Sequence, residues 1–169
     1  MKVNLHLTDM VSIMDNNDFH TFNESMKKEG NTLTPSMEDY LEMIYRLSRD
    51  TNFTRIHELS DALNIQPPSA TKMVQKMNEL GFLKYEKYGF IMLEESGRIL
   101  GEVLLKRHET IETLLELLGV PKDIILLETE KMEHTISRDT IHCFEDYIDF
   151  IKKNPDIQNR FKIYQRKKQ

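Results

Sequence analysis

The chain has 169 residues, of which 39% are hydrophobic and 30% charged, a composition typical of globular proteins. It has no apolar run of the ~18 residues that a membrane helix needs, and its first residues lack the apolar core of a secretory signal. A single cysteine, Cys143, excludes an internal disulfide and a cysteine metal site. We therefore expect a cytoplasmic protein, not attached to a membrane, in which oxygen and nitrogen hold any metal.

Charge is unevenly distributed along the chain. The net charge of −5 argues weakly against a protein that binds nucleic acid by charge alone. However, residues 66–89 contain four lysines and two glutamates, whereas residues 128–134 contain three glutamates and a histidine against one lysine. This distribution predicts DNA at one surface and a cation at another.

The N-terminal third contains one predicted helix. Residues 1–31 carry little regular pattern and are interpreted as a flexible extension or a peripheral helix, with His6, Asp9, Asp15, Asp18 and His20 as its notable side chains. Thr34 can cap a helix that begins at Pro35. Apolar residues then recur at helical spacing, which predicts a helix over residues 35–49.

Two short helices and a hairpin follow. Apolar spacing predicts a helix over residues 55–63, a tight turn, and a second helix from the two prolines at 67 and 68 to about residue 80, before Gly81. Residues 82–93 are aromatic and β-branched around Gly89, which predicts a hairpin. Two short helices and a hairpin together predict a helix-turn-helix with a wing.

The rest of the chain is predicted to be helical. An apolar face runs from Ser96 to Leu118, and further helices are expected at about residues 121–135, 137–151 and 155–166, followed by a basic tail. The expected fold is therefore mostly α. A winged helix-turn-helix DNA-binding domain (32–104) precedes an all-helical domain (105–169), with the boundary inside the long helix.

The second helix of the pair is the candidate DNA reader. Small side chains would let it enter a major groove only ~12 Å wide, while lysines there and on the hairpin could contact phosphates. An ordinary three-helix domain with a solvated polar face is the alternative. The candidate DNA-binding residues are Ser69, Thr71, Lys72, Gln75, Lys76, Lys87 and Tyr88.

Metal-ligand types recur at same-face helical spacing on three separate helices. Together they would form an oxygen-rich site without sulfur, which favours Mn²⁺ or Fe²⁺, although Zn²⁺ can bind more tightly. Enough acids are present for one or two cations per subunit. Taken singly, each group also fits a solvated helix face, and His108 also fits a packed histidine. The candidates are Asp39, Glu42, His108, Glu112, Glu130, Glu133 and His134.

Several segments in the right order and at the right separations resemble the manganese-dependent regulators of the diphtheria toxin repressor family. These segments are residues 34–45 (TPSMEDYLEMIY), 68–77 (PSATKMVQKM), 85–88 (YEKY), 107–109 (RHE) and 133–134 (EH). The resemblance covers residues 33 to about 155. It implies a homodimer that binds a palindromic operator and represses genes for manganese uptake.

The same resemblance implies a ligand set. Asp39, Glu42, His108, Glu130, Glu133 and His134 match the family's manganese ligands. Iron-responsive members have a methionine at the position of Asp39 and a cysteine at that of Glu130, so this chain is expected to sense manganese. No C-terminal SH3-like domain, as in those iron sensors, is expected. The extension, the segment after residue 155 and Thr135 depart from the family pattern.

Three rival interpretations remain. The chain could be an iron-responsive regulator, or a winged-helix regulator that responds to an organic ligand, with the carboxylates merely on its surface. A di-metal carboxylate enzyme is less favoured, because such enzymes show Glu-x-x-His pairs on two helices. The last cluster here is instead Glu-x-x-Glu-His at residues 130–134. We therefore expect neither an enzyme nor a small organic substrate.

Overall fold

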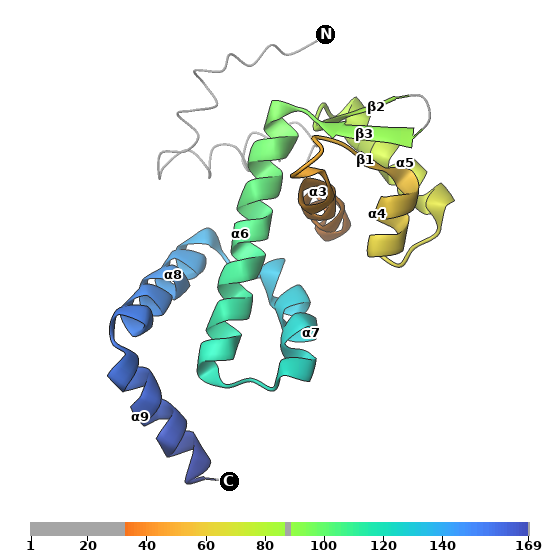
Figure 1. Ribbon diagram of the computed structural model, residues 1–169. Coiled ribbons are helices and arrows are strands. Elements are labelled where there is room, and N and C mark those ends of the chain that lie inside the picture. Colours follow the sequence, from red (N-terminus) through yellow and green to blue (C-terminus); the bar gives the residue numbers. More distant parts are fainter. Residues whose placement is uncertain (1–32, 87–88, 169) are drawn as a thin grey trace.

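The computed structural model describes residues 33–86 and 89–168. The predicted extension, with His6, Asp9, Asp15, Asp18 and His20, lies outside the described residues, as do Lys87 and Tyr88 of the hairpin. The described part is mostly helical, and one long helix joins two groups of elements (Figure 1). The predicted fold class is confirmed.

The first group of elements contains the helix-turn-helix, formed by α4 (Ile56–Ala62) and α5 (Pro67–Glu79), and the wing. It begins with α3 (Pro35–Ser48) and β1 (Thr54–Arg55). The Thr34 hydroxyl accepts a hydrogen bond from the backbone N–H of Met37 at 3.3 Å, so the predicted N-cap of α3 is present. The helices begin and end within a residue or two of the predicted positions.

The wing is a three-stranded antiparallel sheet in the order β1-β3-β2. Strands β2 (Leu83–Tyr85) and β3 (Phe90–Leu93) form the predicted hairpin, and Gly89 adopts the left-handed conformation with φ 78° before β3. The sequence did not predict β1, which pairs with β3 through Thr54 and Arg55. Two residues are too few to show the alternation of a strand.

The second group of elements is built on α6 (Glu95–Leu118), which ends at Gly119 in the left-handed conformation, with φ 80°. It is followed by α7 (Lys122–Glu133), α8 (Arg138–Lys153) and α9 (Pro155–Arg166). Their bounds agree with the predictions to within two residues. No helix in the described ranges is long and apolar enough to cross a membrane.

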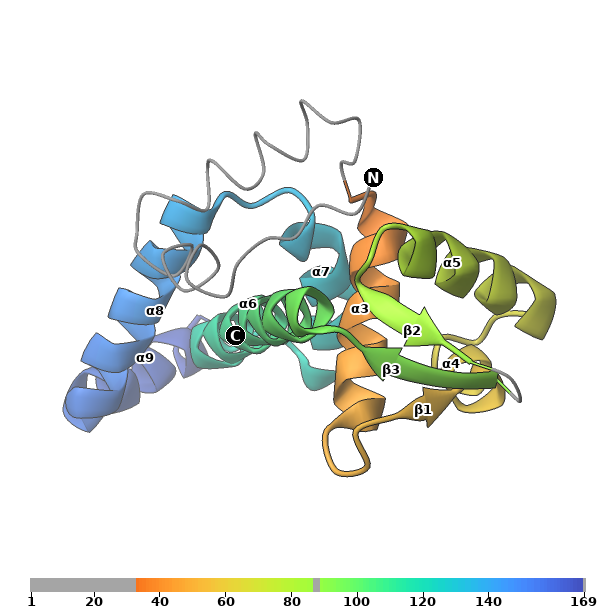
Figure 2. The ribbon, with the colours of Figure 1, turned by 90° about the horizontal axis from the view of Figure 1, so that it is seen from above.

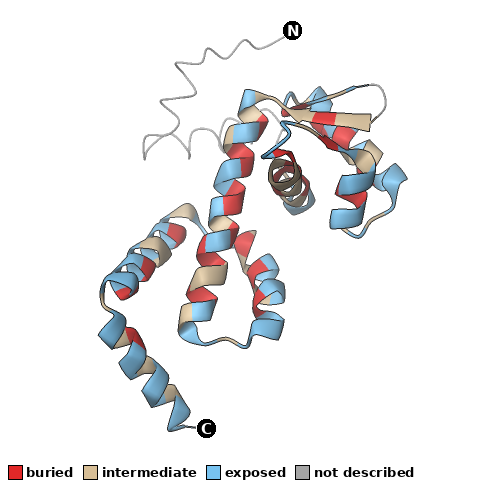
Figure 3. Cartoon of the chain, viewed as in Figure 1, coloured by how far each residue is buried: buried red, intermediate tan, exposed pale blue. Residues whose placement is uncertain are grey.

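Two apolar cores lie along α6. Leu100 and Leu104, in its first half, pack with α3, α4, α5 and the wing. Ile111 and Leu115, in its second half, pack with α7 and α8. Figure 3 shows the buried residues following α6 from one group of elements to the other. This helix is therefore shared by both cores.

Helix α3 lies directly against α6. A Cβ atom added to Gly101 of α6 would lie 2.6 Å from the Cβ atom of Tyr45 in α3, so only glycine allows this approach. Figure 2 shows that α3 runs between the wing and α7. The N-terminal half of α3 thereby faces both α6 and the end of α7, where most of the expected metal ligands lie.

Candidate metal centre

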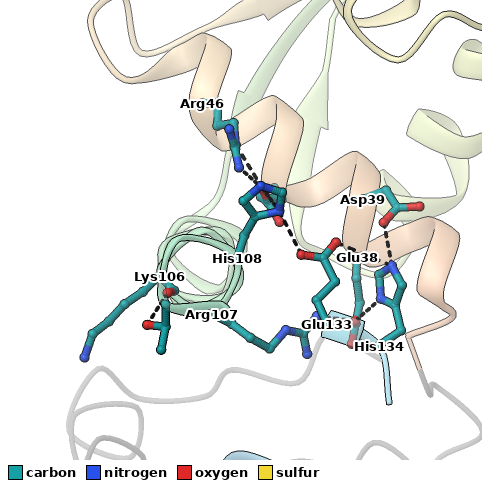
Figure 4. A network of polar contacts seen from close by, with 10 residues as sticks. Glu38, Asp39, Arg46, Lys106, Arg107, His108, Glu133 and His134 are labelled. Atoms are coloured by element: carbon teal, nitrogen blue, oxygen red, sulfur yellow. Dashed lines mark hydrogen bonds and ion pairs between the residues drawn. The ribbon is translucent and has the colours of Figure 1, made fainter. Parts of the chain in front are cut away.

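Three helices of the two groups of elements bring acidic and histidine side chains together (Figure 4). Asp39 and Glu42 come from α3, His108 comes from the middle of α6, and Glu133 is the last residue of α7. His134 follows as the C-cap of α7. Five of the six expected ligands therefore meet although they are up to 95 residues apart (134 − 39).

The first set of possible ligands is deeply buried. Glu42, His108 and Glu133 are only 8%, 4% and 2% exposed. The Nδ1 atom of His108 lies 2.8 Å from Oε2 of Glu133 and 3.8 Å from Oε1 of Glu42. One ligand atom from each residue lies within 4.8 Å of the others, a spacing that could hold a metal ion.

The second set shares Glu133 with the first. Its other members are Asp39 and His134, and its ligand atoms also lie within 4.8 Å of one another. The Nε2 atom of His134 lies 2.9 Å from Oδ1 of Asp39 and 3.6 Å from Oε1 of Glu133. The Glu133 carboxylate therefore presents one oxygen to each set.

Glu130 and Glu112 belong to neither set. Glu130 is exposed on α7, yet desolvation and the charge of Glu133 raise the pKa of its carboxyl group. Glu130 is thus near enough for the charge of Glu133 to shift its pKa, but its carboxylate does not join either set formed by the other five side chains.

Burial makes the charged forms of these acids unfavourable. Desolvation raises the pKa of Asp39 above its usual value. It also raises the pKa of Glu42, although a hydrogen bond from Arg46 opposes the shift. The hydrogen bond to Glu133 raises the pKa of His108. Carboxylates crowded in this way favour binding of a cation, which neutralises their charge.

The structure adds three charged residues that the sequence did not single out. One oxygen of Glu38 accepts hydrogen bonds from Arg107 at 2.6 Å and from His134 at 2.9 Å. Arg46 donates through Nε to Glu42 at 2.9 Å. The spacing of Arg46, four residues after Glu42, could have suggested their contact. Glu38 and Arg107 are 69 residues apart, so no local pattern could have paired them.

The donor set fits a hard or borderline divalent cation. Three carboxylates and two imidazoles converge, and neither set contains sulfur. Such ligands suit Mn²⁺ and Fe²⁺ better than metals that prefer thiolates. Because α3 supplies two of the candidate ligands and α6 and α7 supply three, an ion bound in either set would join the two groups of elements.

The predicted DNA-reading helix presents a polar face. Ser69, Lys72, Gln75 and Lys76 of α5 are exposed. Thr71 is half-buried, and its hydroxyl donates a hydrogen bond to the Pro67 carbonyl at 2.9 Å. The Asn78 side chain, at the far end of α5, accepts from the backbone N–H of Tyr85 at 3.0 Å and so ties the helix to the wing.

A winged helix-turn-helix joined through a shared helix to a cluster of candidate metal ligands is the arrangement of a metal-dependent transcriptional regulator. Two family models match the chain: "Iron dependent repressor, N-terminal DNA binding domain" over residues 32–91, and "Iron dependent repressor, metal binding and dimerisation domain" over residues 94–162. The chain therefore belongs to the iron-dependent repressor family, which confirms the family resemblance seen in the sequence.

Curated relatives agree with this assignment. The HTH-type transcriptional regulator MntR of Lysinibacillus sphaericus is 40% identical over 124 residues, covering 73% of this chain and 89% of the relative. MntR of Bacillus subtilis is 36% identical over 134 residues, covering 79% and 94%. These relatives are transcriptional regulators, in line with the expectation that the chain is not an enzyme.

Solved structures show the same fold. The manganese regulator SloR has a TM-score of 0.59 and 29% identity, covering 70% of this chain. The metal-dependent transcriptional regulator MtsR has a TM-score of 0.62 and 28% identity, also covering 70% of this chain. The chain spans 55% of the length of each of these two proteins. It is a metal-dependent transcriptional repressor with a DNA-binding domain and a dimerisation domain.

Proposed function

We propose that this repressor binds a palindromic operator as a homodimer when its metal centre holds Mn²⁺. The observation that carries the proposal is the meeting of α3 with α6 and α7 through two sets of ligands that share Glu133. We assign Asp39, Glu42, His108, Glu133 and His134 as ligands. Glu130 is assigned as a sixth ligand at the rim, reached by rotation of its exposed side chain. Two adjoining sets suit one or two ions per subunit.

Manganese is favoured over other metals by the ligand chemistry. All assigned ligand atoms are oxygen or imidazole nitrogen, and the residues at positions 39 and 130 are acids. The relative SloR is described as a manganese regulator. Fe²⁺ and other divalent ions are the competitors, because their affinity for such ligands is comparable or higher.

The proposed switch acts through the repulsion of buried carboxylates. In the metal-free protein Asp39, Glu42 and Glu133 hold like charges close together, which weakens the contact between α3 and α7. A bound cation supplies the neutralising charge. The ligands of α3 are then held against those of α6 and α7, and α5 is fixed relative to the dimerisation domain. Two recognition helices ~34 Å apart would fit successive major grooves.

The two apolar cores also support a division of the chain into two domains. Leu100 and Leu104 pack in the first core, whereas Ile111 and Leu115 pack in the second, which supports a boundary near residue 104. Ser69, Thr71, Lys72, Gln75 and Lys76, with Lys87 and Tyr88 of the wing, are the proposed DNA contacts. We assign the regulator to the cytoplasm, where chromosomal DNA is accessible, and manganese uptake genes as its targets.

The decisive experiment measures DNA binding by the metal-free dimer, titrated separately with Mn²⁺, Fe²⁺ and Zn²⁺ at fixed salt. The DNA is a genomic fragment selected by the Mn²⁺-loaded protein. We expect Mn²⁺ to raise the affinity at least fivefold, since allosteric coupling is typically ~1–3 kcal/mol. Equal affinities with and without metal would refute the switch. A purified protein that carries an organic ligand instead of metal would favour the organic-ligand alternative.

A second experiment tests the assignment of Glu130. Replacing this acid by cysteine adds a soft ligand, so Glu130→Cys should shift the DNA-binding response from Mn²⁺ towards Fe²⁺ or Zn²⁺. Glu128→Cys serves as the control, because Glu128 is another acid of α7 that pairs with Lys131 and belongs to neither ligand set. An unchanged metal profile in Glu130→Cys would remove Glu130 from the ligand set.

A further inference from the structure

Glu38 links three helices through a single oxygen atom (Figure 4). Its Oε2 accepts hydrogen bonds from Nη2 of Arg107 on α6 at 2.6 Å and from Nδ1 of His134 at the end of α7 at 2.9 Å. The side chains of Arg107, Glu38 and His134 are 19%, 22% and 16% exposed. This network is therefore largely shielded from solvent, and Glu38 and Arg107 lie beside the proposed ligands without belonging to either set.

The contact with Glu38 determines which nitrogen of His134 faces the cation position. A carboxylate can only accept hydrogen bonds, so the proton of this contact is on Nδ1. The other nitrogen, Nε2, faces Asp39 at 2.9 Å and Glu133 at 3.6 Å. Metal-binding histidines commonly donate their second ring N–H to a carboxylate, which fixes both the tautomer and the ring orientation.

Arg107 orients Glu38 in turn. It precedes His108 in α6, yet its guanidinium contacts Glu38 and not the buried ligand set. A guanidinium remains charged at all ordinary pH values. The ion pair therefore holds the Glu38 carboxylate between α6 and α7, with Oε2 directed at the His134 ring.

We propose that Glu38 is a positioning residue of the metal centre: anchored by Arg107, it fixes the His134 ring with Nε2 towards the cation. This inference rests on the proposed function, because it assumes that His134 binds the metal. It has a consequence that charge alone would not produce. Arg107 is positively charged and close to the site, yet it supports binding of a cation.

The test compares Mn²⁺ affinity among full-length variants, using the electron paramagnetic resonance signal of free Mn²⁺. Glu38→Gln and Arg107→Gln should each weaken binding about tenfold, the lower end of the usual effect of removing such a partner. The matched control is Glu128→Gln, which removes the same charge from an exposed pair with Lys131 on α7 and should leave the affinity unchanged.

The sign of the Arg107→Gln effect separates positioning from simple electrostatics. If Glu38 and Arg107 acted only through their charges, loss of the arginine would tighten Mn²⁺ binding. Tighter binding would therefore overturn the inference. Glu38→Asp keeps the charge but withdraws the carboxylate by one methylene group, and it should also weaken binding. Full affinity in Glu38→Asp would overturn the inference as well.

A spectroscopic measurement on the more conservative Glu38→Asp covers the case in which Glu38→Gln or Arg107→Gln unfolds. Pulsed electron paramagnetic resonance of bound Mn²⁺ detects coupling to histidine nitrogen, and the coupling from one of the two histidines should weaken in Glu38→Asp but not in Glu128→Gln. Unchanged nitrogen coupling would overturn the inference. The wild-type protein separates this outcome from a failure of the proposed function. If the wild-type protein binds no Mn²⁺, the proposed function is wrong. If it binds Mn²⁺ and the variants are unaffected, only the positioning role of Glu38 is refuted.

Discussion

Arg46 competes with any cation for one of the proposed ligands. Its guanidinium donates to Oε1 of Glu42, the same oxygen that lies 3.8 Å from Nδ1 of His108. A metal ion bound to Oε1 of Glu42 would share this oxygen with Arg46 and would be repelled by the positive charge of its guanidinium. We predict that Arg46→Gln raises Mn²⁺ affinity roughly threefold to tenfold, from a repulsion of about 1 kcal/mol at intermediate dielectric. Titration of the metal-free protein measures the change.

The control for this prediction is Arg98→Gln. Arg98 is also paired with a glutamate in its own helix, Glu95 of α6, but that pair is exposed and belongs to neither ligand set. Its loss should leave Mn²⁺ affinity within twofold of wild type, because surface pairs contribute little. Weaker Mn²⁺ binding in Arg46→Gln would mean that Arg46 organises Glu42 for the metal and does not oppose it.

Glu133 is the ligand on which both sets depend. Each of its oxygens faces a different set, at 2.8 Å from His108 and 3.6 Å from His134. We predict that Glu133→Gln lowers Mn²⁺ affinity by more than about 100-fold, beyond the usual loss for an outer partner. Asp39→Asn should impair only the second set. Counting the Mn²⁺ ions bound per subunit distinguishes Glu133→Gln from Asp39→Asn. Equal stoichiometry and affinity in the two variants would refute a carboxylate shared by both sets.

At the scale of elements, the approach of α6 to α3 sets the distance between the ligands. Gly101 and His108 are seven residues apart, so both lie on the face of α6 that meets α3. A Cβ atom at Gly101 would lie 2.6 Å from Cβ of Tyr45, an atom that cannot rotate away. We predict that Gly101→Ala displaces α6 from α3, weakens Mn²⁺ binding and lowers the free energy of unfolding by about 1–2 kcal/mol. Overpacking of about 1–3 kcal/mol outweighs the better helix propensity of alanine.

Glu102→Ala tests whether helix propensity alone matters. Residue 102 is exposed on the same turn of α6, so this change introduces alanine at a position that is not buried against α3. Urea unfolding and Mn²⁺ titration of both variants give the comparison. If Gly101→Ala binds Mn²⁺ as wild type does, the packing of these two helices does not control the metal centre.

The same elements show what the sequence could and could not provide. Long amphipathic helices and the capping residue Thr34 follow local rules, and these bounds were predicted closely. Same-face spacing also identified Asp39 with Glu42, and it grouped Glu133 and His134 with Glu130, which lies outside both ligand sets. The partnership of Glu38 with Arg107 depends on how α3 crosses α6, which spacing within one helix cannot encode. The two-residue strand β1 was missed because pairing with β3, and not its own pattern, defines it.

For the whole molecule, the metal centre sets the direction in which pH changes stability. The hydrogen bond to Glu133 raises the pKa of His108 above its ordinary value of 6.5. Burial alone would lower the pKa of His134, but the hydrogen bond to Glu38 and the charge of Asp39 raise it. A raised pKa means that the folded state binds the proton more tightly than the unfolded chain does. This stabilisation is complete below pH 6.5 and is lost as the pH rises through the folded values.

We therefore predict that the thermal unfolding midpoint of the metal-free protein decreases as the pH is raised from 6 to 8. Saturating Mn²⁺ should reverse the trend, because protons compete with the metal for the histidines and binding strengthens as they leave. Calorimetry at several pH values, with and without Mn²⁺, measures both slopes. The double variant His108→Gln, His134→Gln should flatten both. A metal-free midpoint that rises with pH would contradict the raised pKa values of these two histidines.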